Sequence, residues 1–402
     1  MAVLAIYEKK CSLCGSCVKA CPFGALKIIG QKVEVNASCK MCRICIKNCP
    51  GKAITLIDEA RAVIDKNEWK GVLVFVEHID GVVHPVTLEL IGKARELAAK
   101  IHHPVYCLFM GSGISGEAEN LLNYGVDKVF SYDDEKLRYY RSDLYANVFE
   151  DCIKKIKPSI VLVGATSIGR SLAPRVAVRF RTGLTADCTG LDLRDNTDLV
   201  QTRPAFGGNI MARIITPNSR PQFATVRYKV MDKAFCTKNP LGAIVRMPIN
   251  KSILKSNIHV LQVTPKEKLP SISDAEILVA GGRGLKEQKD LALLEELATR
   301  LGGLVAVSRP LVEAGWTPYT KQIGLSGRTV KPRLIITCGI SGAVQFTSSM
   351  NMSGYIFAIN KDKNAPIFKV AHYGIVGDLY EVVPRLIERL KTEDNSLCSI
   401  RK

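Results

Sequence analysis

The first 49 residues contain eight cysteines in two runs of identical spacing. Each run reads C-x2-C-x2-C-x3-C-P, and the runs comprise Cys11, Cys14, Cys17, Cys21 and Pro22, then Cys39, Cys42, Cys45, Cys49 and Pro50. Three cysteines at two-residue gaps can wrap one iron–sulfur cubane, while the fourth ligates the other cluster. The spacing therefore predicts two [4Fe–4S] clusters, with the ligand sets Cys11, Cys14, Cys17 and Cys49, and Cys39, Cys42, Cys45 and Cys21.

Zinc binding and disulfide formation are the alternative interpretations of these cysteines. Zinc sites usually close with two C-x2-C pairs or with histidine, and residues 1–65 contain no histidine. We expect a cytoplasmic protein, because residues 1–6 are too short and lack the basic leader of a signal peptide. Disulfides are rare in that compartment. Iron–sulfur ligation is therefore favoured, and residues 1–65 are predicted to form an electron-transfer module.

The chain is strongly basic, with 56 Lys and Arg against 38 Asp and Glu and a formal charge of +18. Such an excess suits a nucleic acid, a membrane surface, an anionic cofactor or an acidic partner. No recognised nucleic-acid motif is present, and no apolar run reaches the ~18 residues of a membrane span. We expect neither nucleic acid nor membrane as a partner. A cluster-based redox sensor or nucleic-acid-binding protein remains an alternative, which salt-dependent affinity for DNA or RNA would support.

Beyond residue 65, apolar runs alternate with segments of helical periodicity. Residues 71–76, 105–109, 126–130 and 160–163 are expected strands, and residues 85–101 an expected helix. This alternation predicts a doubly wound parallel sheet. The expected fold is α/β: a bacterial ferredoxin-like domain (1–65) followed by two Rossmann-like doubly wound domains (66–268 and 269–402), with a linker at 265–270.

Two glycine-rich segments follow expected strands. Residues 111–116 match G-x-G-x-x-G, but a plain strand-to-helix turn is the competing interpretation, since the match is isolated. Residues 281–284 (Gly-Gly-Arg-Gly) precede an expected helix at 286–301, whose amino terminus would favour a pyrophosphate. Further small and polar residues follow expected strands at 334–338 and 356–359. These strand ends predict a nucleotide-binding crevice without specifying the nucleotide. Residues 164–171 could line another pocket or cap a helix.

Several longer motifs carry a family resemblance. They are residues 182–188 (TGLTADC), 201–210 (QTRPAFGGNI), 314–318 (AGWTP), 338–345 (CGISGAVQ), 359–362 (INKD) and 373–378 (YGIVGD). From about residue 70 to residue 391, the chain resembles the alpha subunit of electron transfer flavoproteins. The cysteine-rich extension resembles the anaerobic, electron-bifurcating members.

The resemblance implies one FAD on this chain, and its motif positions imply the contacts. Arg283 would neutralise the diphosphate, and Ser308 and Arg309 would lie near the flavin ring, where a guanidinium stabilises an anionic reduced flavin. The remaining implied contacts are the loop across the flavin (Gln322, Ile323, Gly324, Ser326), the ribityl and phosphate segment (Ser341, Gly342, Ala343, Val344, Gln345) and the adenosine end (Asn360, Asp378, Leu379). The alternatives are that Arg283 and Arg309 are solvated surface arginines and that Asp378 only caps the following helix.

The chain departs from the family pattern at two positions near the implied flavin. Phe346 stands where many members have a histidine that donates to a flavin carbonyl, and Leu325 where many have glutamine. Loss of a donor there should lower the flavin potential. Contacts of Phe346 or Leu325 with FAD are therefore expected to be packing or backbone contacts only.

The sequence offers no positioned nucleophile or acid–base pair, so we expect an electron carrier that is not catalytic alone. The resemblance implies a heterodimer with a β subunit whose FAD is fed by NADH, an FAD-dependent dehydrogenase of acyl-CoA or 2-hydroxy-acid type, and ferredoxin. Electron bifurcation is the expected activity. A non-bifurcating, ferredoxin-linked flavoprotein is the alternative. Cys107, Cys152, Cys188, Cys236, Cys338 and Cys398 lack cluster spacing and are expected to be packed or incidental thiols.

Overall fold

A computed structural model describes residues 2–58, 64–237, 240–264 and 270–400. The chain divides into two compact units, residues 1–64 and 65–402. The expected linker at 265–270 lies outside the described residues except for Pro270, and the division of the second unit at residue 268 stays a prediction. Among the residues with described coordinates, no helix combines the length and the apolar character that a membrane span requires.

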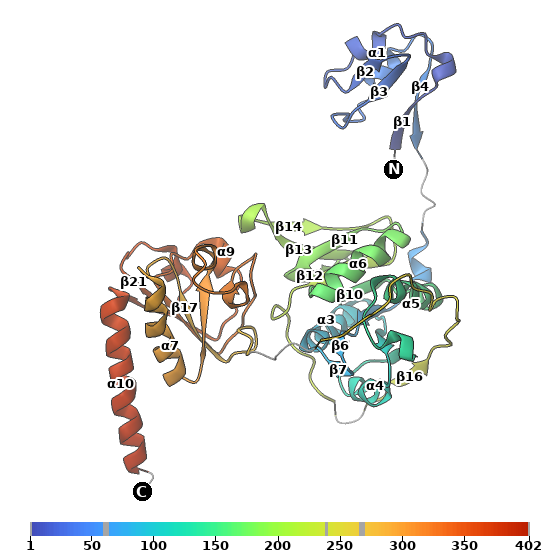
Figure 1. Ribbon diagram of the computed structural model, residues 1–402. Helices are drawn as coiled ribbons and strands as arrows, with labels where there is room; N and C mark the ends of the chain where they lie inside the picture. The colour runs from blue at the N-terminus through green and yellow to red at the C-terminus, as the bar shows by residue number, and fades with distance from the viewer. Residues whose placement is uncertain (1, 59–63, 238–239, 265–269, 401–402) are drawn as a thin grey trace. The chain divides into compact units, whose positions relative to one another are not determined.

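The first unit is a small repeat of strands and one-turn helices. Its elements are β1 (Ala2–Ile6), η1 (Glu8–Lys10), α1 (Ser16–Lys19), β2 (Leu26–Ile29), β3 (Lys32–Val35), α2 (Ile44–Lys47) and β4 (Ile54–Asp58). β1 pairs antiparallel with β4, and β2 pairs antiparallel with β3 (Figure 1). The core consists of Leu4, Cys17, Leu26, Cys45 and Ile54, so one cysteine of each run is buried at its centre.

The second unit contains a seven-stranded parallel sheet in the order β11-β15-β10-β5-β8-β9-β16. Its strands are β5 (Val72–Phe75), β8 (Val105–Gly111), β9 (Lys128–Asp133), β10 (Ile160–Gly164), β11 (Leu184–Cys188), β15 (Gln222–Val226) and β16 (Ala243–Arg246). Neighbouring residues of β5 enter different cores: Val72 and Val74 pack on one face, Leu73 and Phe75 on the other. Burial on both faces explains the continuous apolar run.

Helices cover both faces of this sheet. α3 (Pro85–Ile101) and α4 (Ser115–Leu122) contribute to one core, and α5 (Ser142–Ile156) and α6 (Ser167–Arg179) to the other. A three-stranded antiparallel sheet consists of β12 (Gly190–Leu193), β13 (Leu199–Ala205) and β14 (Ile210–Ile214). A short hairpin is formed by β6 (His78–Ile79) and β7 (Val82–Val83).

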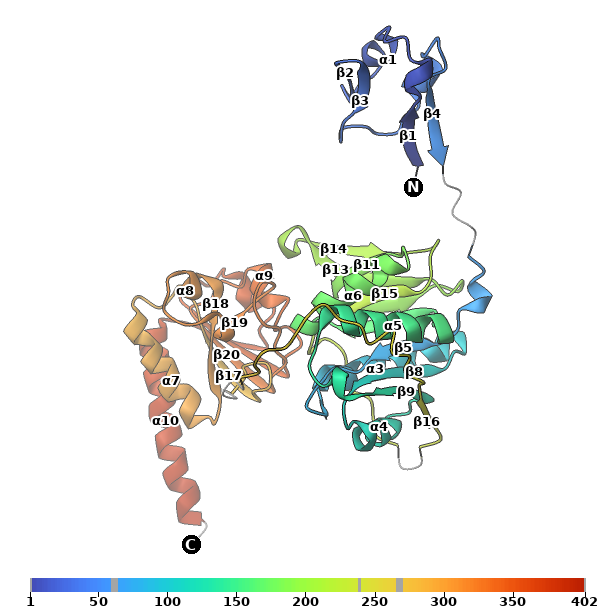
Figure 2. The ribbon, with the colours of Figure 1, turned by 45° about the vertical axis from the view of Figure 1, so that its right-hand side comes forward.

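A second parallel sheet has six strands in the order β19-β18-β17-β20-β21-β22. The strands are β17 (Ile277–Gly281), β18 (Leu304–Ser308), β19 (Gln322–Ile323), β20 (Leu334–Cys338), β21 (Tyr355–Asn360) and β22 (Tyr373–Val376). α7 (Leu291–Arg300) and α10 (Leu379–Ile400) lie side by side over one face (Figure 2). α8 (Arg309–Glu313) and α9 (Val344–Thr347) are short. The predicted α/β fold with a ferredoxin-like amino-terminal segment is confirmed.

One expected element begins later than predicted. The helix expected at 286–301 is α7, which begins at Leu291 after a 3-10 turn at Gln288–Asp290. The Asp290 carboxylate accepts hydrogen bonds from the backbone N–H groups of Lys286 and Glu287, which holds that segment in a capped turn. Gly284 is therefore separated from the helix amino terminus by a turn, and the expected helix start at about residue 286 is wrong.

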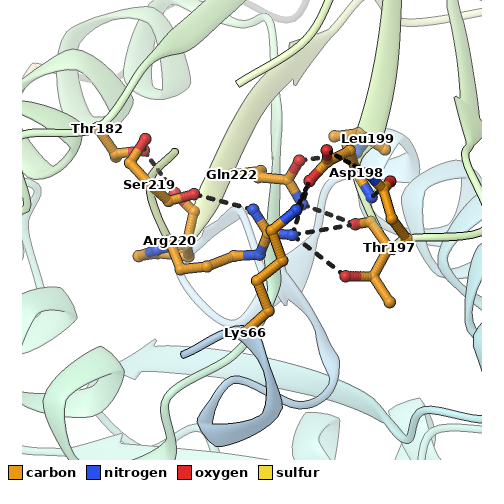
Figure 3. Close-up of polar contacts among 10 residues, drawn as sticks. Lys66, Thr182, Thr197, Asp198, Leu199, Ser219, Arg220 and Gln222 are labelled. Atoms are coloured by element: carbon orange, nitrogen blue, oxygen red, sulfur yellow. Dashed lines mark hydrogen bonds and ion pairs between the residues drawn. The ribbon is translucent and has the colours of Figure 1, made fainter. Parts of the chain in front are cut away.

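A buried ion pair fixes the segment that opens the second unit. The side chains of Arg220 and Asp198 are 0% and 2% exposed, with a 2.9 Å N–O distance. Lys66 also donates to Asp198 at 2.8 Å, and Thr197 accepts from Arg220 (Figure 3). Gln222 donates to the Thr197 carbonyl and accepts from the Leu199 N–H. These bonds attach Lys66, just after the first unit, to the residues at the starts of β13 and β15.

Candidate cofactor sites

The eight clustered cysteines lie around two small cavities of the first unit. Each cavity takes three cysteines from one run and the fourth from the other. The first is lined by Cys11, Cys14, Cys17 and Cys49, the second by Cys21, Cys39, Cys42 and Cys45. The structure therefore brings together the two ligand sets expected from the spacing.

The fourth cysteine of each run occupies the same local environment. The Ala25 N–H donates to the Cys21 sulfur at 3.4 Å, and the Ala53 N–H donates to the Cys49 sulfur at 3.3 Å. Backbone hydrogen bonds, first that from Ala25, lower the pKa of Cys21. Burial instead raises the pKa of Cys17. Amide donors favour the thiolate that an iron ligand must supply.

The eight thiols are free. Within the described ranges, no three His, Cys, Asp or Glu side chains converge on a single-ion site. In a [4Fe–4S] cluster each iron takes a separate thiolate, so four sulfurs surround a cavity rather than one point. Two sets of four cysteines around two cavities fit such clusters.

A cavity of about 990 Å³ lies at the carboxyl ends of β17, β18, β20 and β21. β17 has β18 on one side and β20 on the other, the switch point where parallel sheets bind ligands. The volume is at the upper end for ligand pockets, as a dinucleotide requires. Thirteen of the fifteen residues implied for FAD line it: Arg283, Ser308, Arg309, Gln322, Ile323, Gly324, Ser326, Ser341, Ala343, Gln345, Asn360, Asp378 and Leu379. Gly342 and Val344 flank lining residues.

The loop from Gln322 to Ser326 is held by its own hydrogen bonds. The Gln322 side chain donates to the Ser326 hydroxyl at 2.9 Å. The Leu325 N–H donates to the Gln345 carbonyl at 2.8 Å, and the Tyr319 hydroxyl donates to the Ser326 carbonyl. Gly324 has φ 148°, a backbone conformation that glycine adopts without steric cost. The serine hydroxyl therefore has a defined position at the cavity.

The two expected arginines differ in their partners. Arg309 forms an ion pair with Glu313 at 2.8 Å, one helical turn along α8. Arg283 is exposed at the cavity, and it has no hydrogen-bond or ion-pair partner in the part of the chain that the structure describes. Its charge is thus available to an anionic group.

The expected adenosine-end residues also have structural roles. The Asp378 carboxylate accepts from the Tyr380 N–H at 2.9 Å, which caps the first turn of α10. The Asn360 side chain donates to the Ile340 carbonyl at 2.9 Å and accepts from the Asp362 N–H. The capping interpretation of Asp378 is therefore supported, although the residue also lines the cavity.

Several lining residues were not among the expected contacts. They are Asp187, Arg203, Arg227 and the turn at 204–208, together with Lys286, Lys361 and others of the second sheet. Arg227 donates to the Leu325 carbonyl at 2.9 Å and pairs with Asp187 at 3.4 Å. Asp187 also pairs with Arg170 at 2.9 Å. The family motifs at 182–188 and 201–210 contain several of these residues and could have indicated them. A family motif does not show, however, which of its residues line a cavity that is formed mainly by another sheet.

Arg227 supplies a direct test of whether the cavity suits an anionic cofactor. Its Nε is buried and has no hydrogen-bond partner among the described residues. Burial lowers the pKa of Arg227, while Asp187 opposes that shift, and an arginine stays charged at neutral pH. A buried donor without a partner at the cavity, with Arg283 and several hydroxyl and amide side chains, fits a bound diphosphate-containing flavin.

Phe346 and Leu325 both line the cavity. Phe346 is 5% exposed and packs in the core with Ile340 and Met350. Both backbone polar groups of Leu325 are hydrogen-bonded: its carbonyl accepts from Arg227, and its N–H donates to the Gln345 carbonyl. The expectation of packing contacts only from these side chains remains a prediction.

In the G-x-G-x-x-G segment at 111–116, two backbone N–H groups are already hydrogen-bonded within the protein. The Gly113 and Ile114 N–H groups donate to the Asp133 carboxylate at 2.7 and 3.2 Å. At the neighbouring candidate, 164–171, the Thr166 hydroxyl accepts from the Gly169 N–H at 3.0 Å and caps α6. The turn and capping interpretations describe these segments. Of the remaining cysteines, Cys107, Cys152, Cys188 and Cys338 are buried, Cys236 is exposed, and the Cys398 side chain lies outside the described residues.

A dinucleotide-sized cavity beside a parallel sheet and cysteines grouped for iron–sulfur ligation define an iron–sulfur flavoprotein of electron transport. Comparison with known families gives the same class. Residues 72–251 match the electron transfer flavoprotein domain, residues 271–351 the electron transfer flavoprotein FAD-binding domain, and residues 4–27 the 4Fe–4S binding domain. The chain belongs to the electron transfer flavoprotein alpha-subunit family.

Three relatives illustrate the range of the family. The chain is 56% identical to lactate dehydrogenase (NAD(+),ferredoxin) subunit LctC of Acetobacterium woodii, over 94% of this chain and 90% of that protein. It is 44% identical to the electron transfer flavoprotein subunit alpha of Thermoanaerobacterium thermosaccharolyticum, over 81% and 99%. It is 38% identical to the acryloyl-CoA reductase electron transfer subunit beta of Anaerotignum propionicum, over 83% and 98%.

Proposed function

We propose that this chain is the alpha subunit of a bifurcating electron transfer flavoprotein that links NADH, ferredoxin and an FAD-dependent dehydrogenase in the cytoplasm. The observation that carries the proposal is the presence on one chain of two four-cysteine sets and an FAD-sized cavity. The name of the relative from Acetobacterium woodii, which includes NAD(+) and ferredoxin, supports it. That match covers 94% of this chain and so includes part of the first unit.

Each cysteine set would hold one [4Fe–4S] cluster. One set is Cys11, Cys14, Cys17 and Cys49, and the other is Cys39, Cys42, Cys45 and Cys21. When bound, the clusters supply one-electron chemistry, and FAD supplies exchange of one or two electrons. The Ala25 and Ala53 amides that donate to Cys21 and Cys49 would orient these ligands and stabilise their charge.

One FAD would occupy the large cavity. Arg283 would face the diphosphate as an unpaired cation, and Arg309, in its ion pair with Glu313, would lie near the ring. Gln322 would hold the Ser326 hydroxyl toward the ring, with Ile323 and Gly324 supplying the loop backbone. The other proposed contacts are Ser308, Ser341, Gly342, Ala343, Val344 and Gln345 along the ring and chain, and Asn360, Asp378 and Leu379 at the adenosine end.

The proposed partners are a β subunit, a dehydrogenase and ferredoxin. The β subunit would carry its own FAD and accept hydride from NADH. For the dehydrogenase we favour a 2-hydroxy-acid type, because the relative named for lactate dehydrogenase matches along more of this chain than the relative named for acryloyl-CoA reductase. Of each electron pair from NADH, one electron would reduce ferredoxin and the other would pass to the dehydrogenase.

The test is anaerobic purification with the β subunit and measurement of iron, acid-labile sulfide and FAD. We expect about eight irons per alpha chain. NADH should then reduce ferredoxin only when the dehydrogenase and a 2-oxo acid are present, since the second electron needs an acceptor. Ferredoxin-linked activity that never uses NADH would instead establish the non-bifurcating alternative.

Two cysteine variants provide a further test and its matched control. Cys42→Ala should lose about half of the iron and the coupling to ferredoxin, because one cluster loses a ligand. Cys236→Ser changes an exposed thiol outside both sets and should keep both. Zinc in place of iron in the wild-type protein would contradict the proposal.

A further inference from the structure

The two halves of the first unit share a backbone but differ in charge. Residues 11–26 and 39–54 correspond at an offset of 28. Leu13 and Met41, which correspond, have φ 55° and 53°. The next corresponding pair, Gly15 and Arg43, have φ 71° and 64°. Each of the latter pair is the residue before a one-turn helix. The halves are thus structural copies, and differences between them are substitutions on one scaffold.

Two of these substitutions place cations around the second cysteine set. Ser12 corresponds to Lys40, and Gly15 corresponds to Arg43. Glycine adopts a left-handed conformation without steric cost, whereas another residue there costs about 1–2 kcal/mol. Arg43 thus adds a cation to the lining of the second cavity at a backbone position that glycine adopts at lower cost.

The surroundings of these cations also differ between the halves. Besides Lys40 and Arg43, the second cavity is lined by the exposed side chains of Phe23, Met41 and Ile44, at 45%, 38% and 36%. We call these five residues the second rim. The first cavity has one lining cation, Lys10, and its large apolar side chains are buried or half-buried. Neither Lys40 nor Arg43 has an ion-pair partner within the described residues.

We propose that the second rim is the docking surface for a small acidic one-electron carrier protein of the ferredoxin class. The proposal rests on the proposed function, which requires such a carrier, and names the surface that receives it. Unpaired cations steer an acidic partner and fix its orientation, while exposed apolar side chains form the desolvated centre of a contact. A carrier docked there would lie against the cavity of Cys21, Cys39, Cys42 and Cys45. One electron lost by one protein would be gained by the other, with no bond or proton exchanged.

The decisive variant gives the second rim the residues of the first half. We would prepare the cofactor-loaded complex of the full chain and β subunit with K40S/R43G and titrate it with a purified acidic two-cluster ferredoxin. We expect the Kd to rise about tenfold or more at low ionic strength, with a weaker salt dependence than wild type. K40R/R43K keeps the charges and should bind within about twofold of wild type.

A charge-relocated control separates a specific surface from overall charge. S12K/G15R/K40S/R43G has the net charge of the wild type but carries the cations on the first half. A Cβ at Gly15 would have its nearest neighbour, the Ile28 side chain, at 3.9 Å, so an arginine there meets no clash, and its left-handed backbone costs the same ~1–2 kcal/mol that Arg43 costs in the wild type. Binding should stay weak in this variant. Restored binding, or unchanged binding by K40S/R43G, would overturn the docking proposal.

Carbodiimide cross-linking gives a readout that does not depend on activity. Carboxylates of the ferredoxin should couple to Lys40 in the wild-type complex, and mass spectrometry locates the linked lysine. Iron, sulfide and FAD contents must equal those of wild type in every variant. If wild type exchanges electrons with ferredoxin but cross-links at Lys10 or elsewhere, the docking proposal alone is wrong. If fully loaded wild type neither binds nor exchanges with ferredoxin, the ferredoxin link of the proposed function is wrong as well.

Discussion

Both sheets of the second unit are parallel, but they differ at the carboxyl ends of their central strands. Side chains fill this end of the first sheet, and a cavity lies at this end of the second. At the switch point of the first sheet, Glu77 follows β5 and accepts a hydrogen bond from Thr166, which follows β10. Asp133 closes the neighbouring loop by accepting from the Gly113 and Ile114 amides. At the switch point of the second sheet a cavity of about 990 Å³ remains. A parallel sheet thus offers a ligand position, but side chains decide whether the protein fills it.

This difference divides the strand ends at the two switch points into a scaffold and a cofactor site. Substitutions in the first sheet, other than at the cavity-lining Asp187 and Arg227, should change the free energy of unfolding without changing FAD affinity. Substitutions at the open end of the second should change FAD affinity with little effect on the apoprotein.

The largest effect is expected at the buried ion pair of the first sheet. Asp198→Ala leaves the Arg220 guanidinium buried without its counter-charge, which should cost about 3–5 kcal/mol. Burial alone would raise the pKa of Asp198, but hydrogen bonds from Lys66 and Arg220 hold it below its usual value. The wild-type advantage should therefore be present at neutral pH and decline in acid as Asp198 becomes protonated. Denaturant unfolding of the two proteins at several pH values measures it.

The control for this prediction is Lys66→Ala. It removes the more exposed partner of the same carboxylate and should cost only about 1 kcal/mol or less. FAD per folded chain should stay at the wild-type value in both variants. A loss of FAD affinity in folded Asp198→Ala would contradict the division into scaffold and cofactor site.

Arg283→Ala should produce the next largest effect, at the open strand end. A charge-assisted hydrogen bond to the diphosphate is worth about 1.5–3 kcal/mol, so the FAD Kd should rise about 10- to 100-fold. Flavin fluorescence during titration of the apoprotein measures this change. Arg300→Ala, on the exposed face of α7 and outside the cavity, should leave the Kd unchanged. If wild type and Arg283→Ala bound FAD with equal affinity, Arg283 would be a solvated surface residue without a role in FAD binding.

Glu89 should give the first sheet a pH-dependent stability with the opposite sign to Asp198. Burial raises its pKa from 4.5 to about 7, although the Lys229 N–H donates to its carboxylate at 2.9 Å. The folded state therefore prefers the protonated form, so stability is greatest below about pH 4.5 and falls as pH rises toward 7. The loss should be on the order of 1–3 kcal/mol. Glu89→Gln should lack this slope in unfolding measurements between pH 5 and 8, whereas a parallel slope would contradict the assignment.

Much of the fold was predictable, because it depends on local patterns. Continuous apolar runs placed β5 and β20. The grouping of Cys49 with the first run and Cys21 with the second followed from spacing that also fixes the loop geometry.

The parts that sequence reasoning missed depend on contacts between distant segments. Arg227 reaches the Leu325 carbonyl across 98 positions, and no local pattern encodes that approach. The start of α7 was misplaced because the Asp290 side chain stabilises a 3-10 turn that hydrophobic periodicity does not report. Whether the G-x-G-x-x-G match binds a nucleotide could not be predicted, because its loop amides bind the carboxylate of Asp133, 20 positions from Gly113.

Asp133 offers the smallest effect but the most direct challenge to the comparison between the sheets. Asp133→Ala removes the acceptor of two backbone N–H groups, which should cost about 1 kcal/mol as water replaces it at this partly exposed loop. FAD content and affinity should not change, because the loop belongs to the filled strand end. Thermal unfolding and flavin titration of the same preparation measure both quantities, with Asp134→Ala as the control for a neighbouring carboxylate that caps only the short turn at Glu135–Leu137. If wild type bound a nucleotide besides FAD and Asp133→Ala abolished that binding, the first sheet would be a second nucleotide site rather than a scaffold.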